Sequence, residues 1–289
     1  MSTYTCKICD YRTDKPQDAE LGTARGNTER FRHQRFHLWQ CPRCKSIHNV
    51  DPVDFADIYR DYPLNDRRLD VFARGTLSNL LKRLMAAGLK KSDSILDIGC
   101  GAIPVMMEFL KERGFTDLTG FDPYVAAYSR RPDRQFDCVI VNDVIEHVPD
   151  PRTFALECAA FVKPGGLLYM GTADTAGVDM RQLEPHLMRL HLPFHRVIVS
   201  EASLEALMRS TGLDVIAKYR RSYMDTLRPF SSYRFLDEFS AALGHVMERS
   251  LAPDAAKILL KRPQLLFYAF FGYFVPSAYE PAVVLRRRA

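Results

Sequence analysis

The sequence lacks a hydrophobic run long enough to cross a bilayer, because its longest apolar stretch, Leu265–Pro276, is far shorter than the ~20 residues of a spanning helix. It also lacks the pattern of a secretory signal peptide, since its first segment is polar and charged from Tyr4 onward. Low-complexity tracts and internal repeats are absent as well. These absences predict a folded protein that works in the cytoplasm.

Neither sign of charge dominates the composition. The 289 residues are 47% hydrophobic and 26% charged, with a formal net charge of +5 and a pI of about 8.8. Such a mild basic excess is compatible with an anionic partner but does not require one. The length allows one large domain, or one domain with a small appendage.

Seven cysteines without a secretory signal predict reduced thiols that bind a metal or pack in the core, rather than disulfides. Four of them form two Cys-x-x-Cys pairs, Cys6 with Cys9 and Cys41 with Cys44. Two such pairs can place four thiolates around one zinc ion, with a short hairpin between them bringing the pairs together. We therefore predict a zinc-ribbon-like module over residues 1–52. Three histidines, expected on its surface, are less suited as ligands: His33, His37 and His48.

Two interpretations of the module's role stay open. Basic and aromatic residues alternate in it, as in some RNA-binding surfaces: Arg30, Phe31, Arg32, Arg35, Phe36 and Trp39. The other interpretation, a solvated face packed on the next domain, suits the modest charge better.

From Asn65 onward, helical and strand patterns alternate. A helix is predicted from an Asn65 cap to Gly88, and Pro104 begins another. The remaining segments are strands at 94–98, 117–122, 136–143 and 167–172 and a helix at 151–162. This order predicts an α/β fold, a doubly wound and mostly parallel sheet.

The polar residues of this domain follow its predicted strands. Gly99 and Gly101 come directly after the first strand, and Asp122 ends the second. Ligands of doubly wound sheets bind at the carboxyl ends of the strands, and glycines let the backbone approach them closely. Asp122 is therefore placed to accept both hydroxyls of a ribose.

Four motifs in this order resemble the class I S-adenosylmethionine-dependent methyltransferases: "ILDIGCG", "GFDPY", "FDCVIVNDVIEHVPDP" and "VKPGGLLYMGT". The resemblance covers residues 65–222 and the final strand near Pro281. It implies S-adenosylmethionine as cofactor. The carboxyamino end of this cofactor would lie over the glycine turn and its ribose at the end of the strand 117–122. Its methionine and adenine side would lie at the end of the strand 136–143. The implied residues are Asp97, Gly99, Cys100 and Gly101, then Asp122, Pro123 and Tyr124, and finally Asn142, Asp143 and Val144.

The sequence departs from this family between Asp122 and Asp137, where the interval is too short for the usual helix and third strand. One of these elements must be missing or reduced. The residue that would hold the adenine amine is therefore not identified. Tyr124 either stacks on the purine or packs under a loop.

The acceptor is expected to be a small molecule or a sugar or glycan. Methyl transfer needs a base only for a hydroxyl or an acidic carbon, and the candidates are His147 and His195. Two alternatives remain: an RNA methyltransferase that grips RNA with the zinc module, and a catalytically silent binding protein.

Residues 53–289 form the predicted methyltransferase domain, which carries a helical insert at about 225–280. An insert of this length before the last strand suggests a lid or an acceptor-binding cap. Its aromatic run at 264–276, with basic residues nearby, suggests contact with a membrane surface, while a helix packed in the core is the simpler alternative.

Overall fold

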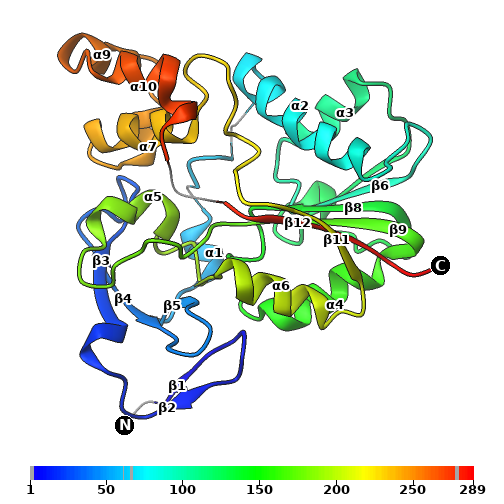
Figure 1. The fold of residues 1–289 in the computed structure, drawn as a ribbon, viewed down its shortest axis with the longest axis horizontal. Coiled ribbons are helices and arrows are strands. Elements are labelled where there is room, and N and C mark those ends of the chain that lie inside the picture. The colour runs from blue at the N-terminus through cyan, green and yellow to red at the C-terminus, as the bar shows by residue number, and fades with distance from the viewer. Residues whose placement is uncertain (1–2, 61, 66–67, 277–279) are drawn as a thin grey trace. The chain divides into compact units, whose positions relative to one another are not determined.

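The computed structural model describes residues 3–60, 62–65, 68–276 and 280–289 (Figure 1). The chain divides into two compact units, each built from separate stretches of sequence. The first comprises residues 1–63, 173–203 and 225–279, and the second comprises residues 64–172, 204–224 and 280–289. Each unit is described by itself.

The second unit is built on a twisted, mostly parallel sheet. Its described strands are ordered β11-β12-β9-β8-β6-β7. Strand β6 is parallel to β7 and β8, β8 is parallel to β9, and β12 and β11 close the other edge as an antiparallel pair. The bounds are β6 Ile95–Ile98, β7 Leu118–Phe121, β8 Phe136–Asn142, β9 Val162–Gly171, β11 Asp214–Tyr219 and β12 Ala282–Arg286. The predicted doubly wound, mostly parallel fold is confirmed.

Helices cover both faces of this sheet. Figure 1 shows α2 and α3 on one face and α4 on the other. These helices are α2 Val71–Ala86, α3 Val105–Glu112 and α4 Pro151–Ala160, and α6 Glu201–Arg209 follows later in the chain. The core on the α2 and α3 side is apolar and contains fully buried Leu80, Leu84, Phe109 and Tyr169. The runs of four and more buried residues in β6 and β8 are typical of strands covered on both faces.

Helix α2 begins later than its sequence pattern predicts. Asp70, rather than Asn65, is the N-cap, and its Oδ1 accepts a hydrogen bond from the Ala73 amide at 2.7 Å. Asn65 lies in a turn before the helix, and residues 66–67 fall outside the described residues. Both residue types favour N-caps, so the pattern alone did not distinguish the two positions.

The interval after β7 is short, as its sequence predicts. Residues 122–135 are all described and contain no strand, only the single 3-10 turn η2 Ala126–Tyr128. Strand β7 consequently lies at the edge of the sheet.

The first unit contains two small antiparallel sheets. Strands β1 and β2 form a hairpin, and the larger sheet has the order β10-β5-β4-β3. The predicted hairpin between the cysteine pairs is present, since β3 pairs with β4. The bounds are β1 Tyr4–Thr5, β2 Arg12–Thr13, β3 Leu21–Arg25, β4 Arg35–Gln40, β5 Ile47–Asn49 and β10 Val197–Ile198.

Short helices complete the first unit. The helical insert predicted before the last strand is present as α7, α8, α9 and α10. The bounds are η1 Asp18–Glu20, α1 Phe55–Ile58, η3 Glu184–His186, α5 Leu187–Leu190, α7 Tyr233–Ala242, α8 Met247–Leu251, η4 Ala255–Lys257, α9 Ile258–Lys261, α10 Leu265–Phe271 and η5 Gly272–Phe274. Among the described residues, no helix has the length and hydropathy needed to traverse a bilayer.

The amino-terminal segment and the insert are joined by direct contacts within this unit. The Met247 amide donates to the Asn27 carbonyl at 2.8 Å, and Arg249 forms an ion pair with Glu29. Residues 173–203 share one apolar cluster with residues 24–62, in which Phe31, Phe36 and Phe194 are buried. The division of the chain at residue 52 stays a prediction.

The aromatic residues of the amino-terminal segment face inward. Phe31, Phe36 and Trp39 are at most 8% exposed, so their rings offer no surface on which a base could stack. Arg30 forms an ion pair with Asp57. These contacts favour the packed interpretation of the segment.

The Asp70 cap makes a first testable prediction. Asp70→Ala removes the acceptor of the Ala73 amide, so it should lower the free energy of unfolding by about 1 kcal/mol. Asp70→Asn keeps an acceptor oxygen and should lose only a few tenths. Urea unfolding followed by circular dichroism measures both, and an equal loss in the two variants would show that the charge matters rather than the cap.

Candidate functional site

A glycine turn follows β6 at the point where the sheet order reverses. Gly99 and Gly101 have φ angles of +76° and +70°, which side chains rarely adopt. The Gly99 amide donates to the Phe121 carbonyl at 2.7 Å, and a Cβ on Gly99 would lie 2.5 Å from Val144. Among the described residues other than its two chain neighbours, none has an atom within 4 Å of a Cβ built on Gly101, so this side of the turn is open to a ligand.

The Asp122 carboxylate ties this turn to the end of β7. Its Oδ2 accepts the Gly101 amide at 3.1 Å, and its Oδ1 accepts the Tyr124 amide at 3.0 Å. Each carboxylate oxygen has two lone pairs, so each keeps acceptor capacity beyond these bonds. Asp122 is thus both a structural acceptor and a group that can receive ligand hydroxyls.

Asp97, inside β6, is a buried carboxyl. Burial, followed by the charge of Asp122, raises the pKa of Asp97 to about 7. Removing a carboxylate from water disfavours its ionised form, and a second carboxylate nearby adds to this cost. A cationic ligand group beside Asp97 would act in the opposite direction.

The end of β8 presents a second set of polar atoms. Asn142 Nδ2 donates to Asp143 Oδ2 at 2.7 Å, whereas Asn142 Oδ1 is buried and has no hydrogen-bond partner among the described residues. A buried acceptor without a donor is costly, so this oxygen suits a ligand that donates a hydrogen bond. Sequence reasoning missed one neighbour, Tyr223, whose hydroxyl lies 3.5 Å from Asp143 Oδ2. No motif marks this tyrosine, which follows β11.

The polar residues described so far fit a nucleoside cofactor with a charged tail. Carboxylate oxygens, an open glycine turn and an orphaned amide oxygen lie at the carboxyl ends of β6, β7 and β8, which are adjacent in the sheet. Cys100 is buried within the turn, and Tyr124 is 63% exposed beyond Pro123. An exposed ring is accessible to a purine face, but nothing in the structure assigns it that role.

The two histidines proposed as bases belong to different units. His147 follows β8 in the second unit, and its amide donates to the Val144 carbonyl at 3.0 Å. His195 lies in the first unit, where its Nδ1 is 2.7 Å from the Arg189 carbonyl. Because a carbonyl only accepts, Nδ1 carries the proton and Nε2 the lone pair. Burial lowers the pKa of His195 to about 4, so its ring is neutral at pH 7.

The four paired cysteines of the first unit converge. The sulfur of Cys6 lies 3.4 Å from that of Cys44, and the sulfur of Cys9 lies 3.6 Å from that of Cys41. All four sulfur atoms are within 4.8 Å of one another. Zinc–sulfur bonds of ~2.3 Å in a tetrahedron place sulfurs about 3.8 Å apart, so the donor set fits a zinc ion.

The histidines near this cluster are not among its ligands. His33 and His37 are exposed, as predicted. His48, in contrast, is buried and stacks on Trp39 with ring centroids 5.3 Å apart. The prediction of a surface position for His48 was wrong, because its ring packs against its cross-strand neighbour Trp39 on one face of the sheet.

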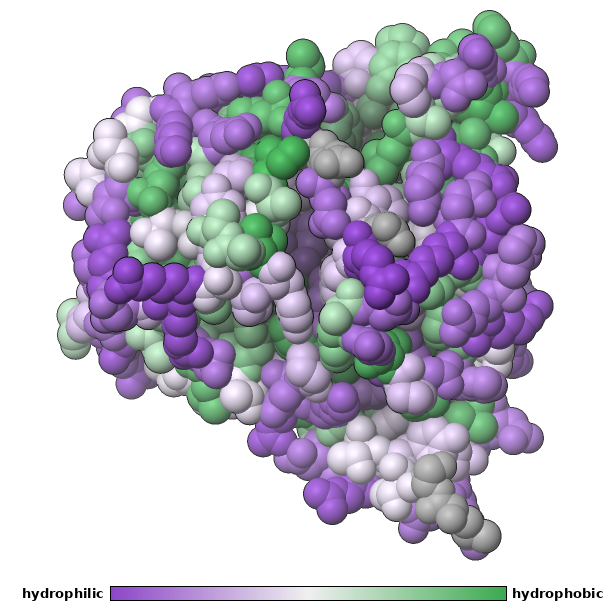
Figure 2. Space-filling model, turned by 180° about the vertical axis from the view of Figure 1, so that it is seen from behind, coloured by the Kyte–Doolittle hydropathy of each residue, from purple (hydrophilic) through white to green (hydrophobic). Residues whose placement is uncertain are grey.

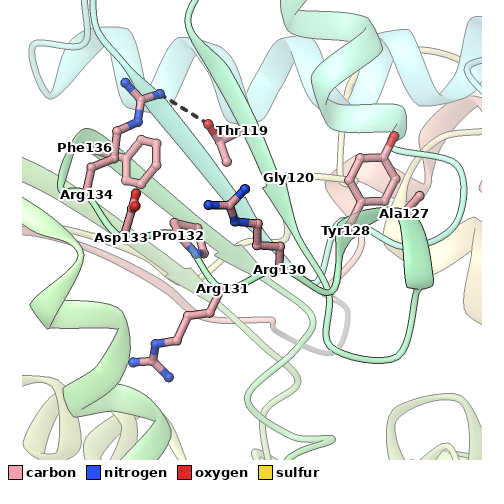
Figure 3. Close-up of a pocket in the computed structure, with 10 residues that line it drawn as sticks. All are labelled: Thr119, Gly120, Ala127, Tyr128, Arg130, Arg131, Pro132, Asp133, Arg134 and Phe136. Carbon is pink, nitrogen blue, oxygen red and sulfur yellow. Dashed lines mark hydrogen bonds between the residues drawn. The ribbon is translucent and has the colours of Figure 1, made fainter.

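A separate pocket lies at the free edge of β7 (Figure 3). It has a volume of about 260 Å³ and is lined by Thr119, Gly120 and residues between Ala127 and Phe136. Arg134 donates to Thr119 at 3.3 Å and forms an ion pair with Asp117. Its lining includes no residue of the glycine turn, so it is distinct from the site described above.

The sheet order and the polar strand ends define a class I methyltransferase fold. Residues 69–218, just over half of the chain, match the family described as "Methyltransferase domain". The chain belongs to this family, and the resemblance seen in its motifs is confirmed.

Curated relatives carry the name ubiquinone biosynthesis O-methyltransferase. The protein from Thiobacillus denitrificans is 31% identical over 144 residues, which are 48% of this chain and 59% of that protein. The chain therefore spans less than two thirds of this relative's length. The protein from Nitrosospira multiformis is 27% identical over 226 residues, or 74% of this chain and 93% of its own length.

Solved structures resemble the chain at low sequence identity. An S-adenosylmethionine-dependent methyltransferase from Archaeoglobus fulgidus covers 73% of this chain and 93% of its own, with 14% identity and a TM-score of 0.43. One from Mesorhizobium loti covers 73% and 100%, with 14% identity and a TM-score of 0.43.

The pKa of Asp97 predicts how stability changes with pH. The folded state keeps the Asp97 proton up to about pH 7, while the unfolded chain releases it near pH 4. The folded state thus binds more protons in this window, and this carboxyl reduces stability as pH rises through it.

Asp97→Asn removes this ionisable group. It should therefore raise the melting temperature of the ligand-free protein at pH 8 by several degrees relative to wild type, with the difference shrinking towards pH 4. The exposed Asp133→Asn serves as control. A variant less stable than wild type at pH 8 would mean that the Asp97 carboxylate is held in its ionised form.

Proposed function

We propose that this protein transfers the methyl group of S-adenosylmethionine to an oxygen atom of a small-molecule acceptor. Three features support the proposal: membership of the methyltransferase family, the set of polar strand ends and the activity for which the curated relatives are named. The observation that carries it is the joint geometry of Gly101 and Asp122. The Gly101 amide donates a hydrogen bond to Asp122 Oδ2 at 3.1 Å. The open side of the turn therefore lies next to carboxylate oxygens that can still accept hydrogen bonds.

Each residue of the set has one task in binding. Asp122 accepts the two ribose hydroxyls, as charge-assisted hydrogen bonds favour. The backbone at Gly99 and Gly101 passes close to the methionine end, and Asp97 faces its ammonium group. Asn142 Oδ1 gains the donor that it lacks without ligand. The bound cofactor supplies an activated methyl group, so the protein mainly aligns the acceptor and excludes water.

An oxygen acceptor requires a base. We assign this task to His195, since its neutral tautomer carries the lone pair on Nε2. His147, after β8, is the second candidate. A sugar or glycan hydroxyl and the hydroxyl of a quinone precursor are both oxygen acceptors, and the relatives' name favours the latter class.

We also propose one structural zinc ion on Cys6, Cys9, Cys41 and Cys44, supported by their sulfur distances. The ion would join the two cysteine pairs, which lie outside the apolar cluster around Phe31 and Phe194.

Cofactor binding tests the main proposal. Calorimetric titration should show binding of both S-adenosylmethionine and its demethylated product to wild type. Asp122→Ala should weaken both at least tenfold, because each lost bond to a charged group is worth about 1.5–3 kcal/mol. The same change removes the acceptors of two backbone amides, so the melting temperature of the ligand-free variant should fall as well.

A second ligand, which lacks one ribose hydroxyl, distinguishes the loss of the ribose contact from a distortion of the loop. Wild type should bind the 2′-deoxy analogue of the product more weakly than the product itself, whereas Asp122→Ala should bind the two alike. If the variant still discriminates between them, Asp122 is a turn former only. If wild type binds neither S-adenosylmethionine nor its product, the enzymatic proposal fails.

The zinc proposal predicts one zinc per chain by elemental analysis. Cys41→Ser combined with Cys44→Ser should abolish it, whereas Cys158→Ala, in α4, should retain it. Trp39 is the sole tryptophan, and it is buried near the cluster, so chelation should shift its fluorescence to longer wavelength. Unchanged zinc content in the double variant would refute the ligand set.

A further inference from the structure

Helix α10 and the following turn η5 have two apolar faces. One face is packed, because Leu265 and Ala269 form an apolar cluster with Phe235 of α7. An ordinary amphipathic helix would present polar residues on its opposite side.

The opposite face of this helix is apolar and exposed. Its side chains recur at helical spacing, i and i+4, and a further leucine of α9 is also exposed. The exposed fractions are Leu260 87%, Leu266 41%, Phe267 55%, Phe270 53%, Phe271 55% and Phe274 72%. Figure 2 shows apolar side chains of this region at the surface, at the upper right, among hydrophilic ones. These six residues are called the insert face below. A cluster of this size marks an interaction surface, since single exposed apolar residues are the norm.

Within the stretch of sequence that carries the insert face, the charged residues are cations. Lys257, Lys261 and Arg262 are exposed beside it, and the stretch from Ala255 to Pro276 contains no aspartate or glutamate. The nearest acid before it, Asp254, lies 3.5 Å from Lys257. The face therefore combines large aromatic side chains with a cationic border.

We propose that the insert face docks on the surface of an anionic phospholipid bilayer. Aromatic and leucine side chains would enter the acyl boundary while the three cations contact lipid phosphates, as in helices that lie in the membrane plane. No described helix is long and apolar enough to cross a bilayer, so the contact is peripheral.

A second copy of the chain fits this face less well. Symmetric pairing would place the same cations opposite one another, with Asp254 beside Lys257 as the one acid that this stretch of sequence provides. The phosphates of an anionic lipid surface would balance the charge of all three cations. The inference rests on the insert alone and does not depend on the proposed cofactor site.

Vesicle binding tests the proposal with the full-length protein. The protein should co-sediment with vesicles that contain phosphatidylglycerol and much less with pure phosphatidylcholine, and 0.5 M salt should weaken the binding. Phe270→Ser combined with Phe274→Ser should weaken it at least tenfold. Lys257→Gln combined with Lys261→Gln should weaken it roughly thirtyfold, since each cation near such a surface is worth about 1 kcal/mol.

Matched controls lie away from the insert. Leu156→Ser removes an apolar residue of similar exposure, 54%, and Lys90→Gln with Lys91→Gln removes two exposed cations. Both should bind vesicles as wild type does, and melting temperatures and product titration should show that every variant is folded. Equal sedimentation of wild type with both kinds of vesicle, or without them, would overturn the proposal. A wild-type dimer that Phe270→Ser with Phe274→Ser dissociates would also overturn it and assign the face to self-association.

Discussion

Strand β6 pairs in parallel with β7 on one side and with β8 on the other, and this double pairing determines where the site is. The chain runs from β6 to one neighbour and then crosses back to the other, so the loops at their carboxyl ends diverge and leave room for a ligand. The Gly99 amide bonds to Phe121 and the Gly101 amide to Asp122, which join the ends of β6 and β7. The residues that would hold a cofactor are thus also those that fix the turn.

Much of this arrangement follows from local sequence. The apolar runs of β6 and β8 and the glycines that follow are short-range signals, and they predict both the sheet and its polar edge. The loss of an element after β7 was likewise predictable, because the interval between Asp122 and Asp137 is too short for both a helix and a strand. The sequence pattern was wrong where two residues are both suitable N-caps. Helix α2 is capped by Asp70 rather than by Asn65. The sequence could not predict the unpaired oxygen of Asn142 or the position of Tyr223 near Asp143. Both depend on how side chains from distant segments of the chain are arranged.

In the first unit, contacts between segments distant in the sequence are even harder to predict. Strand β10 has two residues and pairs with β5, about 150 residues earlier in the chain, so no periodic pattern reveals it. His48 of β5 is buried against Trp39, although the complete cysteine pairs had favoured a surface position for it. The apolar cluster around Phe31 and Phe194 likewise draws its members from segments that the sequence assigns to different domains. A segment too short to form its own core can obtain one from residues far away along the chain.

The electrostatics of the strand ends connect stability with ligand binding. Asp97 is buried beside the charge of Asp122, and its raised pKa means that the ligand-free protein loses stability when this carboxyl ionises. A site of this kind favours a ligand that brings positive charge, because the ligand's ammonium or sulfonium group offsets both the burial and the repulsion. A cationic ligand would bind the ionised form more tightly than the protonated one, so its binding would release a proton near neutral pH. In the proposed function, the buried acid that weakens the ligand-free fold is also the group that selects a cationic cofactor.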